Sequence, residues 1–479
     1  MRVRVRHFMA IGLVCGLIFT STNLLAQSTA RVPIGPPTSA RSHSPLVPSG
    51  PRPQVLLPKG PVGGGVKLGQ SYDGIDFLGS NCDCLPPDTN AAVGDNYVVE
   101  TVNLQMRVFD KTTGAVLLDE PLSTLYGALG PAISDPYVLY DDIADHWYIS
   151  AIDSNFPNLG LLLAVSQTND PTGAWYVYDL SAVGGFPDFP KPGFNKDAIF
   201  ISYNDFGSNG GYAGVAAIDK AQALAGNLVY YTSYPPPQFR AIPPAQMHGD
   251  VTGGTEWFVS IWDFGGNTVR VTQMTNYLSN NPQYLVSELP VQPFETFAPA
   301  DQPGAPSSVA DNDPTATQVQ YHNGRLVTAT WASTAADGFV YPKGHYYQID
   351  VNGNGVVKPR LMKEGVIDPG PGVSVWMVSA DEDIQGNLGF TWMESSSTEY
   401  LSMWTGNLYT NGNFSAQVAA PGEGFFYFSF RTGDYSSTVL DPSDGRTFWS
   451  ANEYIGANGG PDPFTSDIWL THITSFRAR

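Results

Sequence analysis

Four aspartates recur at equivalent positions of a repeated pattern: Asp88, Asp135, Asp188 and Asp434. Each lies six or seven residues before a second Asp or Asn at a turn, and an apolar, aromatic stretch follows. Carboxylates gathered in one place could supply a general acid and a general base, because like charges push neighbouring pKa values apart. They could instead hold calcium together with Asn90. A role that recurs in every repeat favours a third interpretation, in which each Asp caps its turn by accepting backbone N–H bonds.

Residues that depart from the repeat are informative, because a catalytic or binding role need not recur. Lys191 stands where the other repeats carry apolar or small residues. Arg431 and Tyr435 flank the last of the four aspartates. We expect these three side chains, with Asn90, to bind substrate beside the carboxylates.

His248 and Asp250 occupy the corresponding region of the fourth repeat. Histidine is the natural proton shuttle near neutral pH, so His248 is the best single candidate for a general base, and Asp250 joins the catalytic set. His146 and His322 fall in inner turns that we expect to face away from the central funnel. The alternative is a structural histidine beside a glycine-rich turn.

The repeat also predicts the elements that position these side chains. Strand–turn–strand units recur about every 50 residues, which is typical of a β-propeller. Counting units predicts an all-β, seven-bladed propeller, or five or six blades with a side domain. The last unit offers only three strands, so we expect 71–77 to supply its missing outer strand and avoid an exposed edge. The repeated aspartates would then meet at one central channel. The clearest predicted strands are 97–102, 147–152, 198–203 and 447–452.

The N-terminal part of the chain indicates export. Residues 1–26 combine three arginines, an apolar core and small residues before Ala26, which is typical of a secretory signal. Residues 27–68 are rich in Pro, Ser and Gly and predict a disordered linker. The propeller domain would then span 69–479. We expect a secreted protein, extracellular or periplasmic, with no membrane span.

The net charge of the chain indicates which classes of partner it can bind. The formal net charge of −20 disfavours nucleic acid as a partner, because phosphate binding needs a basic face. An acidic, aromatic, lysine-poor surface suits an extracellular protein that meets neutral sugars, calcium or cationic ligands. We expect a monomer whose partner is an extracellular glycan or protein. Calcium is the one cofactor that this surface suggests.

Cys82 and Cys84 are the two cysteines that remain after signal cleavage. An even count in an oxidising compartment favours a disulfide, although Cys-x-Cys closes a tight ring. The alternative is a metal site, which two thiolates with no nearby histidine leave incomplete.

Two stretches carry a family resemblance. Residues 82–94, Cys-Asp-Cys-Leu-Pro-Pro-Asp-Thr-Asn-Ala-Ala-Val-Gly, and the closing motif 433–454 resemble a group of secreted bacterial propeller-type proteins. The resemblance covers most of 70–479 and implies the fold rather than a chemistry. A more distant likeness is to the Asp-box turn of sialidases, at 168–175 with one extra residue and at 443–449 with one fewer. The arginine triad and Tyr/Glu pair of sialidases have no counterpart here.

Two functions follow as hypotheses. The first is a carbohydrate-active propeller, a hydrolase or lyase that acts on an extracellular polysaccharide in its central funnel. The second is a non-catalytic adhesion or protein-interaction propeller that uses the same face, stabilised by calcium. Four tryptophans are mainly core candidates, but one or two facing the funnel would make a platform for stacking sugars: Trp331, Trp376, Trp392 and Trp404.

Overall fold

The computed structural model describes residues 56–57, 66–82, 84–129, 133–154, 159–180, 183, 185–207, 210–237, 239–249, 253–309, 315–338, 340–352, 358–426, 431–457 and 467–477. The predicted signal segment 1–26, most of the linker 27–68 and Asp250 lie outside these residues. Within them, no helix is both long and apolar enough to cross a membrane.

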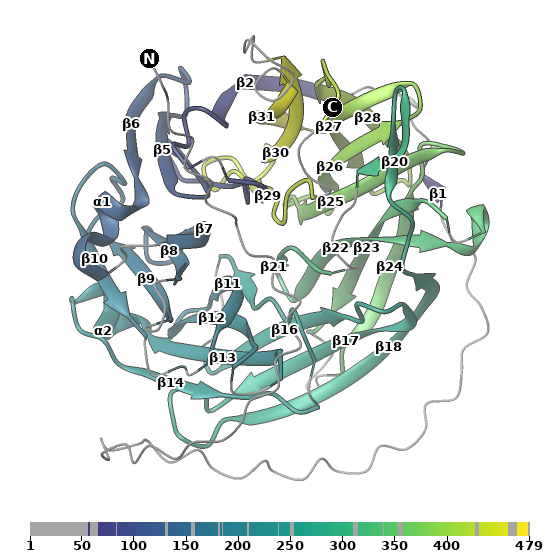
Figure 1. Ribbon diagram of the computed structural model, residues 1–479. Coiled ribbons are helices and arrows are strands. Elements are labelled where there is room, and N and C mark those ends of the chain that lie inside the picture. Colours follow the sequence, from purple (N-terminus) through teal and green to yellow (C-terminus); the bar gives the residue numbers. More distant parts are fainter. Residues whose placement is uncertain are drawn as a thin grey trace, which may run out of the picture. The chain divides into compact units, whose positions relative to one another are not determined.

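Strand pairing places most of the described strands in four separate four-stranded antiparallel sheets and one larger sheet that holds three further groups; we call these groups blades (Figure 1). The first two strands of the fourth group are joined through the bridge between Pro244 and Phe258. Blades one to three are β3–β6 (Asn90–Val93, Tyr97–Val102, Gln105–Asp110, Val116–Pro121), β7–β10 (Ile133–Asp141, His146–Asp153, Gly160–Ser166, Trp175–Asp179) and β11–β14 (Pro187–Phe194, Ala198–Asp205, Tyr212–Asp219, Tyr230–Ser233). Blades four and five are β15–β18 (Ala245–Met247, Thr255–Ile261, Gly266–Thr275, Gln283–Glu295) and β21–β24 (Val319–His322, Arg325–Thr334, Pro342–Asp350, Arg360–Ile367). Blades six and seven are β25–β28 (Val373–Glu382, Leu388–Ser396, Glu399–Leu408, Phe414–Ala420) and β29–β31 (Ser437–Leu440, Phe448–Ala457, Asp467–Arg477) with β2 (Lys67–Asp76).

Few elements lie outside the blades. The strand β1 (Leu56–Leu57) pairs in parallel with β24, and β19 (Ala300–Gln302) pairs with β20 (Ala305–Val309). The described helices are short: α1 (Leu122–Tyr126), α2 (Lys220–Leu224) and the 3-10 turns η1 (Gly127–Leu129) and η3 (Ala335–Asp337).

The innermost strands form a closed ring. The first strand of each blade contacts the first strand of the next, and β29 of blade seven contacts β3 of blade one. The strands β11, β15 and β21 pair in parallel, so the innermost strands begin on one face of the ring and end on the other. We call these the start face and the end face. The predicted all-β propeller is confirmed.

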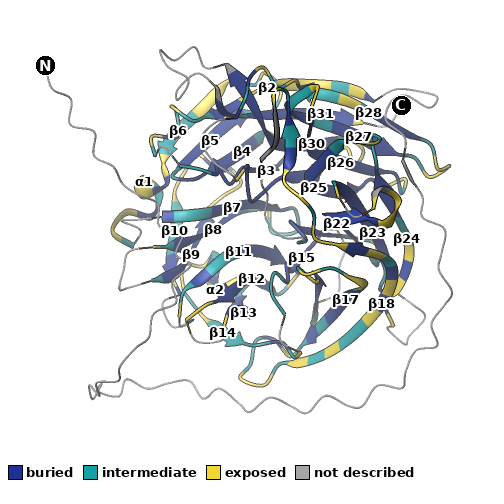
Figure 2. Cartoon of the chain, turned by 45° about the vertical axis from the view of Figure 1, so that its right-hand side comes forward, coloured by how far each residue is buried: buried dark blue, intermediate teal, exposed yellow. Residues whose placement is uncertain are grey.

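Hydrophobic cores lie between neighbouring blades rather than at the centre. Trp331, Trp376 and Trp392 are buried together where blade five meets blade six, and Trp404 stacks on Trp392 with ring centroids 6.3 Å apart. Figure 2 shows the inner strands buried and exposure concentrated on outer strands such as β18. Because these tryptophans pack between blades, they form no sugar platform in the funnel.

Blade seven takes its outer strand from the other end of the chain. The strand β2 pairs antiparallel with β31, so the N-terminal strand completes the blade as expected, beginning at Lys67 rather than at Ser71. Glu100 of β4 joins the two blades at this closure. Its carboxylate accepts the Ile75 N–H at 2.8 Å and the Thr471 hydroxyl at 2.6 Å.

Gly74 is expected to be essential to this closure. A Cβ at Gly74 would lie 2.3 Å from Thr471 Oγ1 and 2.4 Å from Glu100 Oε1. We therefore expect Gly74→Ala to lower the free energy of unfolding by about 1–3 kcal/mol, the usual cost of overpacking. Gly266→Ala is the matched control, because a Cβ there meets only Phe294 at 3.9 Å. Urea unfolding followed by fluorescence measures both, and equal stability of the two variants would contradict the expectation.

The two cysteines lie between β2 and blade one. Cys82 and Cys84 form a disulfide with their Cα atoms 5.1 Å apart. The indole N–H of Trp469 in β31 donates to the Cys84 carbonyl at 2.8 Å. The disulfide segment is thereby attached to the blade that β2 completes.

Candidate functional site

Each innermost strand near the site begins with a backbone irregularity. Asp88 and Asp135 have φ of 57° and 54°, and Phe189, which follows Asp188, has φ of 57°. Asp adopts this left-handed conformation more readily than most residues, which gives Asp88 and Asp135, though not Asp188 and Asp434, a backbone reason. Strand register also shifts between Ser134 and Tyr137, as bulges do where they redirect a side chain.

The structure brings the four predicted aspartates together at the start face. Asn103, from the turn after β4, donates its Nδ2 to Asp88 Oδ2 at 2.8 Å, and its Oδ1 accepts the Asp135 N–H at 3.0 Å. Tyr435 donates its hydroxyl to Asp135 Oδ2 at 2.8 Å. Burial, and then the negative charges of Asp434 and Asp135, raise the pKa of Asp88 well above its usual value.

Asp188 differs from the other three carboxylates. Burial, followed by the charges of Asp135 and Asp434, raises the pKa of Asp188 to about 7, while Arg431 and the Phe189 N–H oppose the shift. Its side chain is only partly buried. A carboxyl group that exchanges its proton near neutral pH and stays accessible is suited to general acid or general base chemistry.

Lys191 lies beneath an aromatic cover. Its Nζ is 3.2 Å from the Tyr435 ring centroid, 4.0 Å from that of Phe189 and 4.8 Å from that of Tyr137. The side chain is buried, and Nζ has no hydrogen-bond partner among the described residues. Burial lowers the pKa of Lys191 well below its usual value, although the neighbouring aspartates oppose this. Lys191 is therefore inside the cluster but shielded from solvent.

Arg431 and Asp434 form an ion pair at the rim of the cluster. The Arg431 side chain remains 50% exposed, so it can reach a ligand. Glu453 of β30 is buried nearby, and burial, followed by the charge of Asp434, raises its pKa well above the usual value. Sequence reasoning missed Glu453 and Asn103 because both come from outside the innermost strands. Glu453 does stand in the closing motif 433–454, which is the one signal for it.

Asn90 does not belong to this cluster. It is buried in β3, donates Nδ2 to the Pro136 carbonyl at 2.8 Å and accepts the Val138 N–H at 2.8 Å. Its amide therefore joins blade one to blade two, which corrects its predicted binding role. Among the described residues, no group of three or more His, Cys, Asp or Glu side chains is arranged to hold a metal ion.

His248 lies on the opposite face from the carboxylates. It directly follows β15, so it stands at the end of an innermost strand, whereas Asp188 stands at the beginning of one. The innermost strand of blade four is only three residues long and precedes His248, which corrects the prediction that His248 shares the aspartates' region. Asp250, its predicted partner, is outside the described residues.

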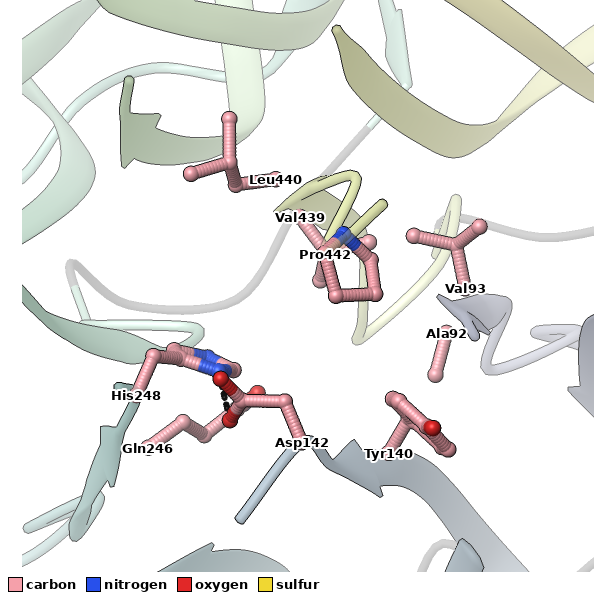
Figure 3. A pocket seen from close by; sticks show the side chains of 9 residues that line it. All are labelled: Ala92, Val93, Tyr140, Asp142, Gln246, His248, Val439, Leu440 and Pro442. Carbon is pink, nitrogen blue, oxygen red and sulfur yellow. Dashed lines mark hydrogen bonds and ion pairs between the residues drawn. The ribbon is translucent and has the colours of Figure 1, made fainter. Parts of the chain in front are cut away.

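The end-face histidine has its own partners. His248 Nδ1 lies 2.9 Å from Asp142 Oδ1 and its Nε2 lies 3.0 Å from Gln320 Oε1. Its ring stacks on His322 with centroids 5.0 Å apart, and His322 Nε2 lies 2.7 Å from Asp381 Oδ1. His322 thus faces the channel end, contrary to its predicted orientation. Figure 3 shows side chains that line a pocket beside this pair, with His248 turned toward Asp142.

Comparisons with known proteins add little to the geometry. No protein-family model matches the chain, and no curated protein matches it. Structures with related folds include a Hadza microbial sialidase (12% identity, 69% of this chain and 65% of that one, TM-score 0.41) and the extracellular domains 1-2 of Drosophila semaphorin 1b (8%, 86% and 87%, 0.37). The catalytic domain of a Coprinopsis cinerea GH62 α-L-arabinofuranosidase is a third (10%, 82% and 98%, 0.34). Similarity this low carries no argument about function.

Proposed function

We propose that this is a secreted propeller that hydrolyses an extracellular polysaccharide at the start face, with Asp188 as the proton-transferring residue. The observation that carries the proposal is the partly buried Asp188 carboxyl, which burial and the charges of Asp135 and Asp434 hold protonated up to about pH 7. Glycoside hydrolysis requires such an acid, which donates its proton to the glycosidic oxygen as the C–O bond breaks. Water then adds to the anomeric carbon and gives up a proton to a carboxylate of the site.

The neighbouring residues have supporting roles in this proposal. Burial and the negative charges of Asp135 and Asp434 keep the proton on Asp188, and the carboxyl groups around it favour the positive charge that develops on the sugar ring. Arg431, exposed at the rim, donates hydrogen bonds to sugar hydroxyls. Export is supported by the signal-like pattern of 1–26 and by the disulfide, which suits an oxidising compartment.

The second candidate is a binding propeller without catalysis. The buried rings of Tyr137 and Tyr435 close over Lys191 at the start of the channel, which limits the depth to which a sugar can enter. Asp88 and Asp135 are held by protein hydrogen bonds, as structural carboxylates are. This arrangement favours a surface that recognises a ligand over one that encloses it.

A pH profile of product release distinguishes the two candidates. The secreted form, 27–479, is incubated with a panel of polysaccharides, with and without chelator, between pH 5 and pH 9. A general acid must be protonated, so product release is expected to fall as pH rises through about 7, the pKa of Asp188. Release that chelator abolishes would implicate calcium instead. Retention on a glycan with no product at any pH would establish the binding propeller.

A further inference from the structure

An exposed patch of aromatic side chains lies on the start face of blades three and four. We call Phe206, Phe239, Trp262 and Phe264 the aromatic platform. Phe264 is 61% exposed, Phe206 46% and Trp262 37%, which is unusual for such large apolar groups gathered together. The Phe239 and Trp262 ring centroids are 4.9 Å apart, and those of Trp262 and Phe264 are 5.7 Å apart. The three rings are therefore contiguous but not coplanar, with interplanar angles of 54° and 65°.

The platform begins on the same blade and the same face as Asp188. In blade three, Asp188 pairs with Asn204 across the two innermost strands, and Phe206 follows two residues later. The Asn204 side chain accepts the Ala241 N–H at 2.9 Å, which fixes the segment that carries Phe239. Trp262 and Phe264 lie in the turn between β16 and β17, where β16 returns to the start face.

Two arginines hold the platform in place. The Arg270 guanidinium lies 4.0 Å from the Phe239 ring centroid and donates to Glu288 at 2.7 Å. Arg270 and Phe239 both line a cavity of about 230 Å³ beside the platform. Arg240 lies 5.6 Å from the Phe206 ring and 3.8 Å from an Asp263 carboxylate oxygen. Both cations of the patch therefore already have acidic partners.

We propose that the aromatic platform is a subsite for an uncharged polysaccharide, whose chain runs from Asp188 across Trp262 and Phe264. The apolar C–H face of a sugar ring packs on an aromatic face, and two rings side by side accept successive sugars. A net charge of −20 disfavours a polyanion, and the paired arginines offer it no free cation. This inference rests on the proposed function, because it assigns the platform to the substrate of Asp188.

Trp262→Ala and Phe264→Ala test the platform without touching Asp188. The matched control is Leu285→Ala, on β18 of the same blade and similarly exposed at 51%. Affinity electrophoresis is run in gels containing arabinan, xyloglucan or mixed-linkage β-glucan, with polygalacturonate as the polyanion. At least one neutral polymer is expected to retard the protein, and each platform variant is expected to bind it at least tenfold more weakly than the control. Circular dichroism confirms that the variants fold.

Iodide quenching supplies a readout at the residue itself. Trp262 is the most exposed of the ten tryptophans, all of which are described, so it should dominate the iodide-accessible fluorescence. The bound neutral polymer is expected to protect that fraction in the wild-type protein, and Trp262→Ala should lack it from the outset. Protection that persists unchanged in Trp262→Ala would overturn the proposal.

The outcomes for the platform and for Asp188 are separable. The subsite would be overturned if both platform variants were retarded as strongly as Leu285→Ala. It would also be overturned if polygalacturonate alone retarded the protein, or if the propeller captured a protein partner and bound no glycan. Weakened binding by the platform variants, with no product from any polymer, would uphold the subsite and refute the hydrolase. Asp188→Asn is expected to retain binding while losing product.

Discussion

Replacing Asp188 by asparagine is expected to lower the rate of product release by about 10²- to 10⁴-fold, the usual contribution of a positioned general acid or base. Asparagine keeps the size and hydrogen-bonding capacity of the side chain but cannot transfer a proton. Glycan binding is expected to remain within about twofold of wild type, because the amide removes no ring contact. Initial rates and affinity electrophoresis on the same polymer measure the two effects.

The stability of this variant provides an independent check. Asp188 has a pKa of about 7 in the folded state, above its value in the unfolded state. Between the two pKa values, the folded state therefore binds a proton that the unfolded state has released. Stability contributed by that proton falls as pH rises from about 4 to 7, and ionised Asp188 is unfavourable above that range. Asp188→Asn should therefore be at least as stable as wild type at pH 8. Such a gain in stability with a loss of activity is typical of functional residues.

Asp179→Asn is the control for charge. Asp179 is exposed at the end of β10, the outermost strand of blade two. Its replacement removes one carboxylate away from the innermost strands and should leave product release unchanged. If Asp188→Asn released product as fast as Asp179→Asn, Asp188 would not be the proton donor, and the start-face cluster would be structural.

His248→Gln is expected to lower the free energy of unfolding, relative to wild type, most strongly at low pH and little at high pH. Although burial lowers the pKa of His248, the charge and hydrogen bond of Asp142 outweigh it and, with the charge of Asp381, raise the pKa to about 9. Because the folded pKa exceeds the unfolded value of about 6.5, the stabilisation is complete below about pH 6.5 and is lost as pH rises through 9. A shift of that size corresponds to about 3 kcal/mol.

Urea unfolding at pH 6 and pH 9.5 measures this effect. Wild type should lose about 3 kcal/mol more than His248→Gln between the two pH values, because the variant has no proton to release. The charged groups around the imidazole are Asp142, Asp381 and His322, all on the end face. His146→Gln, at the start of β8, should behave as wild type. Parallel pH dependence in wild type and His248→Gln would show that the pair contributes nothing to stability.

Much of the architecture follows from local patterns in the sequence. A turn, an apolar strand and a second turn are short-range features, because turn residues and alternating side chains act within a few positions. Their recurrence predicted a propeller, and the count of only three strands in the last unit predicted that an N-terminal strand completes it. The gathering of Asp88, Asp135, Asp188 and Asp434 followed from the same repeat, since equivalent positions of a propeller meet at its centre.

The roles of individual residues depended on tertiary structure. The innermost strand of blade four has only three residues, too few for a periodic pattern, so the face on which His248 lies was not evident. Asn103 reaches the cluster from the turn after β4, and Glu453 reaches it from β30. Trp331 in β22 is buried, whereas Trp262, in the turn directly after β16, is exposed. Proton affinity and exposure depend on neighbours distant in sequence, because burial and Coulomb interactions act through space rather than along the chain.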